Sequence, residues 1–137
     1  MTDPAVEIAR DMRRLEPQTR TAIRPALRQG GQMVAREAAV RSSWSSRIPA
    51  TIRVEVSFRA NREGVRIRMG GPHAPHARPY ENLGEPGTFR HPVYGRDVWV
   101  SQAARPALFP AARDAAPAVT GYLLEQLDAV GASLGFH

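Results

Sequence analysis

Apolar and polar residues alternate most regularly between positions 50 and 70. The apolar positions are Ile52, Val54, Val56 and Phe58 before a turn at 60–64, and Val65, Ile67 and Met69 after it. A period of two is typical of strands with one buried face. The pattern predicts a β-hairpin over 50–70 with an apolar face and an arginine-rich face.

Helical spacing precedes the hairpin, within a helical segment over 1–43. A short helix is predicted from Asp3 to Leu15. A longer one, from about Thr19 or Pro25 to about Ser42, carries a stripe with steps of three and four: Ile23, Leu27, Gly30, Val34 and Ala38. Pro25 either begins this helix or kinks it. Two adjacent glycines at 30 and 31 lower helix stability, and we expect the helix either to pack closely against another element there or to bend on assembly.

A last helix is predicted over 106–134, with Pro117 expected to kink it. Its stripe is Ala112, Ala116, Val119, Leu123, Leu127, Val130 and Leu134. Together these elements predict a single α+β domain over 1–137, in which the C-terminal helix packs on the small antiparallel sheet.

Glycine and proline dominate the segment between the hairpin and the last helix, occupying 10 of the 26 positions from 70 to 95. That density predicts an extended arm over 71–96, followed by a short strand over 97–102. We expect the arm to become ordered against a partner. The candidate interface residues are Arg78, Tyr80, Glu81, Phe89, Arg90, His91, Tyr94 and Trp99.

Charge adds a second candidate surface. The formal net charge of the chain is +6, every basic residue other than histidine is an arginine, and residues 1–60 hold 11 arginines against 6 acids. Such a surface can meet phosphate or the carboxylates of a neighbouring subunit, although arginine replaces lysine throughout the chain, which favours a coding bias. The candidate DNA contacts on the polar face of the hairpin are Arg53, Arg59, Arg66 and Arg68.

Enzyme chemistry has little support in the sequence. Cysteine is absent, and neither a nucleophile elbow nor a phosphate-binding glycine loop occurs. His73 and His76, with Glu81 as the nearest carboxylate, are the candidate metal ligands, and a glycine- and proline-rich loop holds them poorly. We expect no secretory signal at the start and no membrane span. The open alternatives are an assembly protein, a small basic protein that binds nucleic acid without sequence preference, and a loop-based metal enzyme or hydrolase.

The second half of the chain resembles the tail-completion (head–tail joining) proteins of long-tailed bacteriophages. The residues that carry the resemblance are His76-Ala77-Arg78-Pro79-Tyr80-Glu81-Asn82-Leu83-Gly84, Gly87-Thr88-Phe89-Arg90-His91-Pro92-Val93-Tyr94-Gly95, Trp99-Val100-Ser101-Gln102 and Ala104-Arg105-Pro106-Ala107-Leu108-Phe109-Pro110-Ala111. An aromatic-Glu-x-Gly loop and an aromatic-x-Pro-Ala start to the last helix recur in that family, and the middle stretch is similar to members from phages of high-GC actinobacterial hosts. The chain departs from the family at 44–49, where many members have a Thr-Gly-x-Leu turn.

The resemblance implies a structural protein of the virion neck, assembled in the host cytoplasm, without catalytic activity or a cofactor. It implies a ring, expected to hold six copies, that contacts connector or stopper proteins on one side and tail-terminator or tail-tube proteins on the other. Genomic DNA would pass through the lumen of such a ring and could contact arginines without sequence preference.

Overall fold

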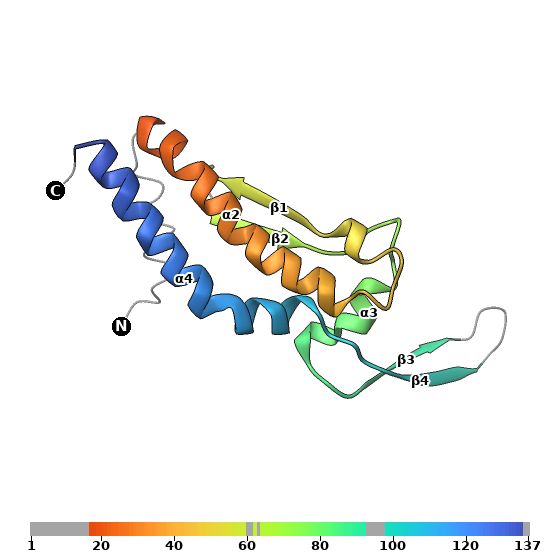
Figure 1. Cartoon of the computed structure of the whole chain (residues 1–137). Helices are drawn as coiled ribbons and strands as arrows, with labels where there is room; N and C mark the ends of the chain where they lie inside the picture. Colours follow the sequence, from red (N-terminus) through yellow and green to blue (C-terminus); the bar gives the residue numbers. More distant parts are fainter. Residues whose placement is uncertain (1–16, 60–61, 63, 93–97, 136–137) are drawn as a thin grey trace, which may run out of the picture.

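The protein has an α+β fold, as the sequence predicts. The computed structural model describes residues 17–59, 62, 64–92 and 98–135. The helix predicted from Asp3 to Leu15 lies outside these residues. Within them, a long helix lies between a second long helix and a β-hairpin, and a separate two-stranded arm extends away from this body (Figure 1).

The central helix, α2 (Pro17–Arg41), has the buried face that the sequence predicts. All five residues of the predicted stripe are buried. The helix begins before Thr19, however, and continues through Pro25 instead of starting there. Proline removes one backbone hydrogen bond, and the burial of Ile23, Ala26 and Leu27 on both sides of it offsets that loss.

Gly30 and Gly31 bring α2 close to two different elements. A side chain at Gly30 would point toward Leu123 and Val119 of α4 (Leu108–Ser133), whereas one at Gly31 would point toward Val54 and Val65 of the hairpin. The close packing expected at the glycine pair is therefore confirmed.

The hairpin consists of β1 (Arg53–Ser57) and β2 (Gly64–Arg68), which are antiparallel in the predicted alternation. Val54 pairs with Ile67 and Val56 with Val65 on the half-buried face. The arginines of both strands lie on the exposed face. Beside β1, the one-turn helix η1 (Pro49–Thr51) leads the chain into the sheet.

Helix α4 occupies the predicted range, but part of the predicted stripe is wrong by one residue. Ala111 is buried and Ala115 packs against the core, whereas Ala112 and Ala116 are exposed. Because positions 111, 112, 115 and 116 are all alanine, the sequence does not distinguish a stripe through 111 and 115 from one through 112 and 116. Leu127 is also 42% exposed, while Val119, Leu123 and Val130 pack inward as predicted.

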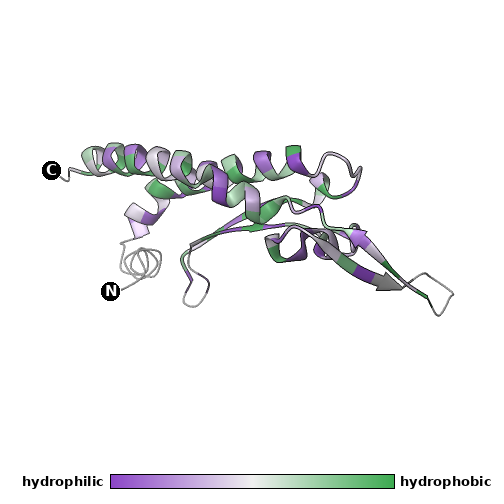
Figure 2. Cartoon of the chain, turned by 90° about the horizontal axis from the view of Figure 1, so that it is seen from below, coloured by the Kyte–Doolittle hydropathy of each residue, from purple (hydrophilic) through white to green (hydrophobic). Residues whose placement is uncertain are grey.

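Helix α4 packs mainly along α2 and not, as predicted, directly on the sheet. It continues through Pro117 as one helix. The two helices lie on one side of the hairpin, and hydrophilic and hydrophobic residues are mixed along their ribbons (Figure 2). Neither α2 nor α4, the long helices of the described chain, has the length and apolar character that crossing a membrane requires.

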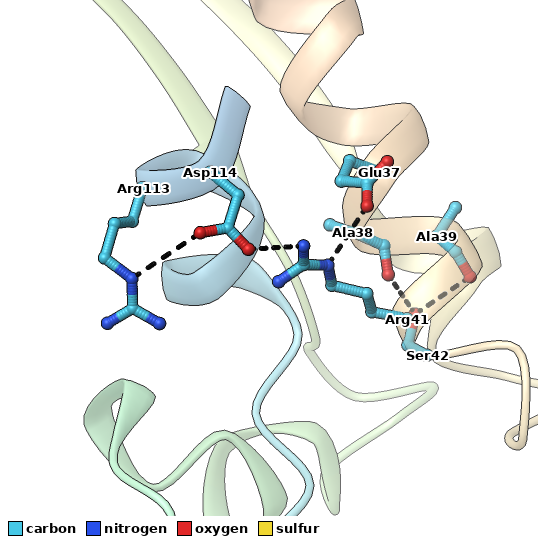
Figure 3. A network of polar contacts seen from close by, with 7 residues as sticks. All are labelled: Glu37, Ala38, Ala39, Arg41, Ser42, Arg113 and Asp114. Atoms are coloured by element: carbon cyan, nitrogen blue, oxygen red, sulfur yellow. Dashed lines mark hydrogen bonds and ion pairs between the residues drawn. The ribbon is translucent and has the colours of Figure 1, made fainter. Parts of the chain in front are cut away.

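An ion pair joins the end of α2 to the start of α4. Arg41 Nη2 lies 2.6 Å from Asp114 Oδ2, and Arg41 Nε lies 3.2 Å from Glu37 Oε1 (Figure 3). The hydrogen bond from Arg41 is the largest influence that holds the pKa of Asp114 below its usual value, and the same bond raises the pKa of Arg41. Beside this pair, just after the end of α2, Ser42 Oγ donates to the carbonyl of Ala38.

The predicted arm over 71–96 contains regular elements that its glycine and proline content did not predict. These are α3 (Ala77–Glu81), the one-turn helix η2 (Asn82–Gly84) and β3 (Thr88–Pro92). Pro79 lies in the first turn of α3, where the helix does not need its N–H. The strand predicted over 97–102 is β4 (Trp99–Ala103), and it pairs with β3.

Candidate functional site

The β3–β4 ribbon is an arm that extends beyond the helices in two perpendicular views (Figures 1 and 2). Its strands are antiparallel, with Thr88 opposite Ala103 and Pro92 opposite Trp99. The side chain of Trp99 is 56% exposed, and that of Val98 is 50% exposed. A two-stranded ribbon is only marginally stable in water by itself, so a partner that covers these apolar side chains would stabilise the arm.

Aromatic rings fix the base of the arm. The Tyr80 ring contacts Trp44, Phe89 and His76 edge-on, with centroid distances of 4.7, 5.1 and 6.2 Å. The guanidinium of Arg105 lies 4.5 Å from the centre of the Trp44 ring. This aromatic cluster (Trp44, His76, Tyr80, Phe89 and Arg105) joins α3, the end of α2 and both flanks of the arm.

Backbone hydrogen bonds reinforce the same junction. The N–H of Arg105 donates to the carbonyl of Tyr80 at 2.8 Å, and the N–H of Ala104 donates to that of Gly87 at 2.7 Å. The arm therefore leaves the body at a defined angle.

Glu81 caps helix α4. Its Oε2 accepts hydrogen bonds from the N–H groups of Ala107 and Leu108 at 2.6 and 3.0 Å, and its Oε1 accepts one from Phe109 at 2.8 Å. A helix leaves its first N–H groups without backbone partners and carries a partial positive charge there. A carboxylate that is only 6% exposed satisfies both requirements.

A left-handed bend places Glu81 at that helix. Asn82 and Leu83 have φ angles of 49° and 55°, and Gly84 has a φ of 82°. A Cβ on Gly84 would lie 2.5 Å from Cβ of Phe109, so glycine is required for this approach. The bend leaves two apolar side chains outside, Leu83 at 78% and Phe109 at 54% exposure, beside a shallow hollow.

The structure divides the four candidate DNA contacts into two groups. Arg53 Nη1 donates to the carbonyls of Thr51 and Gly70, and Arg68 pairs with Glu55 at 3.3 Å. Arg59 and Arg66 instead line a hollow of about 520 Å³ between α2 and the end of the hairpin. Three further arginines line the same hollow: Arg20, Arg24 and Arg62.

Compared with protein-family models, with curated proteins and with solved structures, the chain matches none. The resemblance to tail-completion proteins thus depends on the sequence stretches quoted above. Two of these stretches meet in the fold, since Glu81 caps the helix that begins at Leu108-Phe109-Pro110-Ala111.

The candidate interface residues have different positions. Arg78, Arg90 and Trp99 are exposed. Tyr80 and Phe89 are half-buried in the aromatic cluster, where they shape the arm. His91 lies in β3, and Tyr94 lies outside the described residues. Glu81 is predicted to contact a partner, but it is buried and its carboxylate accepts three hydrogen bonds from within the chain.

Two of the three candidate metal ligands make hydrogen bonds within the chain, and the third lies at another hollow. His76 Nε2 lies 3.2 Å from Ser45 Oγ, and Glu81 caps α4. His73 is exposed and lines another hollow, which Arg53 also lines. Among the described residues, no three histidine or acidic side chains are grouped as a metal ion requires.

Sequence reasoning did not select Trp44, Arg62 or Arg105 as site residues. Trp44 and Arg105 are separated by 61 positions and meet only through the tertiary fold. The four-residue spacing of Arg20 and Arg24 places both on one face of a helix. The sequence could not show that the hairpin end lies against that face.

Proposed function

We propose that this chain is a structural protein of a phage neck, a tail-completion or head–tail joining protein whose copies associate into a ring. The observation that carries the proposal is the projecting arm, whose exposed Trp99 and Val98 lie on a ribbon outside the body. Such a ribbon is suited to contact a second copy, and a head-to-tail contact of this kind closes into a ring when its rotation permits. The resemblance described above supplies the virion location.

Further exposed apolar side chains support an assembly role. Leu83 and Phe109 form one group beside the bend, and Leu124 is 60% exposed on α4. Large aromatic side chains such as Trp99 often carry much of the binding energy at protein interfaces. In the proposed ring the arm binds a neighbouring copy, and the flat sides of the ring meet the connector and the tail.

The mass of the full chain in solution, measured by light scattering over a concentration series, tests the proposal. We expect masses of several copies, alone or after addition of connector and tail-tube proteins. Trp99→Ala should shift the mass toward the monomer, because it removes the largest exposed side chain of the arm. The matched control is Val40→Ala, which changes an apolar residue of 68% exposure at the end of α2.

A chain that stays monomeric at all concentrations and with those partners would contradict the proposal. Equal effects of the two substitutions would contradict the role of the arm. Circular dichroism of each variant checks that the fold is retained.

The second function open from the sequence, nucleic-acid binding without sequence preference, is favoured by one observation, the five arginines around the hollow. It is compatible with a neck protein, since DNA passes through the proposed ring.

A further inference from the structure

The hollow between α2 and the hairpin is unusual in its charge. Among the described residues that line it, five are arginines and one, Glu55, is acidic; these lining residues are Arg20, Arg24, Glu55, Val56, Ser57, Phe58, Arg59, Arg62, Gly64 and Arg66. We refer to it as the arginine hollow. Like charges gathered in one place repel one another, and an anion that binds among them removes this repulsion.

The core of the protein holds two of these arginines in place. The guanidinium of Arg24 lies 4.9 Å from the centre of the Phe58 ring, and that of Arg20 lies 6.0 Å from it. Arg24 Nη1 also donates to the carbonyl of Val56 at 3.3 Å. Phe58 is only 8% exposed and packs with Ile23 and Leu27. The ring that both guanidinium groups contact is therefore held in place by the core.

The hairpin supplies the opposite side. The N–H of Arg62 donates to the carbonyl of Arg59 at 3.0 Å. The N–H of Arg59 itself donates to Ser57 Oγ at 3.2 Å. Local hydrogen bonds therefore hold the backbones of Arg59 and Arg62, and both arginines border the hollow.

The chemistry of the hollow favours phosphate over a protein partner. Protein interfaces usually have an apolar centre with a polar rim. Among the described residues, the large apolar side chains of 42% exposure or more lie elsewhere, and none of them lines the arginine hollow. Guanidinium groups present several N–H donors in a plane, which matches the oxygens of a phosphate.

We propose that the arginine hollow binds the phosphodiester backbone of DNA, with Arg59 and Arg62 on one side and Arg24 on the other. The contact carries no sequence preference, because phosphates are the same at every base pair. This inference does not depend on ring formation. Where a ring forms, it identifies the surface that meets the DNA, and it replaces Arg53 and Arg68 of the sequence prediction with arginines of α2 and of the hairpin end.

The test is fluorescence anisotropy of the full chain with two labelled duplexes of unrelated sequence, from about 50 to 200 mM salt. We expect equal affinity for both and a steep loss of affinity with salt. The double substitution Arg59→Ala and Arg62→Ala should weaken binding roughly tenfold or more at the lowest salt. It should also reduce the slope of log affinity against log salt by about 1 to 2, since each lost phosphate contact releases about one counterion fewer.

The matched control is the double substitution Arg36→Ala and Arg47→Ala, which removes the same charge from two exposed arginines outside the hollow. It should change the salt slope by much less. The variant Arg24→Ala tests the contribution of the α2 side of the hollow to DNA binding. Its helix content is checked by circular dichroism, because Arg24 also contacts Phe58.

Three results would overturn the inference: no binding at about 50 mM salt, a tenfold preference for one duplex, or equal losses in the hollow and control variants. The mass of each sample is measured by light scattering in parallel. DNA binding by a strict monomer would contradict the proposed ring but would support DNA binding by the arginine hollow. Association that is independent of these arginines, without DNA binding, would support the ring and contradict DNA binding by the hollow.

Discussion

Gly31 of α2 and Val54 of β1 lie so close together that no side chain fits between them. A Cβ built on Gly31 would lie 2.5 Å from Cγ1 of Val54 and 2.8 Å from Cγ1 of Val65. At Gly30, one position earlier, the nearest atom would be Leu123 Cδ2, at 3.2 Å. At this glycine pair, the hairpin therefore approaches α2 more closely than α4 does.

We expect Gly31→Ala to destabilise the protein and Gly30→Ala to have little effect. Alanine favours a helix over glycine by about 1 kcal/mol at either position. At Gly31 the clash with two stiff valines should outweigh this gain, for a net loss of about 1 to 2 kcal/mol. At Gly30 the flexible end of Leu123 can move aside. Urea unfolding of the two variants compares them, and a Gly31→Ala protein as stable as the wild type would contradict the packing described.

Removal of the Glu81 carboxylate should destabilise the start of α4. Glu81→Ala leaves three N–H groups without their acceptor, which costs about 2 to 3 kcal/mol. Glu81→Gln keeps an oxygen but loses the charge and should cost less. The control is Glu85→Gln at an exposed position four residues later. Denaturant unfolding measures each loss, and the cap has no such role if Glu81→Ala and Glu85→Gln behave alike.

The ion pair between Arg41 and Asp114 should make stability depend on acid pH. Because the hydrogen bond from Arg41 lowers the pKa of Asp114 in the folded state, its stabilising effect is fully present above the ordinary value of 3.8. It is lost as the pH falls through the lower, folded pKa. Asp114→Asn should therefore lower the urea midpoint at pH 7, and the difference from wild type should shrink as the pH falls below about 4.

Asp128→Asn is the control for this pH series, because it removes the same charge from α4 fourteen residues further along. High salt should reduce the effect of Asp114→Asn, since the carboxylate is exposed to solvent. A difference between Asp114→Asn and wild type that stays constant down to pH 3 would show that the ion pair is not its source.

Tyr80→Ala should loosen the arm without unfolding the body. The substitution removes ring contacts with Trp44 and Phe89, each worth about 0.5 to 1.5 kcal/mol. Hydrogen exchange of the amides in β3 and β4 should become faster, while exchange in α2 remains slow. Tyr122→Ala, on α4, is the matched control. Unchanged exchange in the arm would mean that the aromatic cluster does not hold it.

The parts of the fold that repeat along the chain could be predicted from the sequence. The alternation at 52–58 and the stripe from Ile23 to Ala38 each have one dominant period and one buried face. The start of α4 could not be resolved, because Ala111 and Ala112 are chemically equal and only contact with α2 distinguishes them. Short elements such as α3 and β3 depend on distant partners, so glycine and proline content predicted a loop.

The candidate site shows the same division. The sequence singled out Tyr80 and Glu81, but it could not show that Glu81 faces α4, because the bond spans 26 residues. It also selected Arg59 and Arg66 by strand alternation. The arginine hollow needs Arg24 from a helix that lies more than 30 positions earlier.

The geometry of the arm has a mechanical consequence. Each of its strands has five residues, and at about 3.4 Å per residue the ribbon is a lever roughly 17 Å long. A rotation of about 10° at the aromatic cluster would move its far end by about 3 Å over that length. In the proposed assembly, adjacent copies could thus adjust their spacing by turning this lever, while the helices and the hairpin keep their packing.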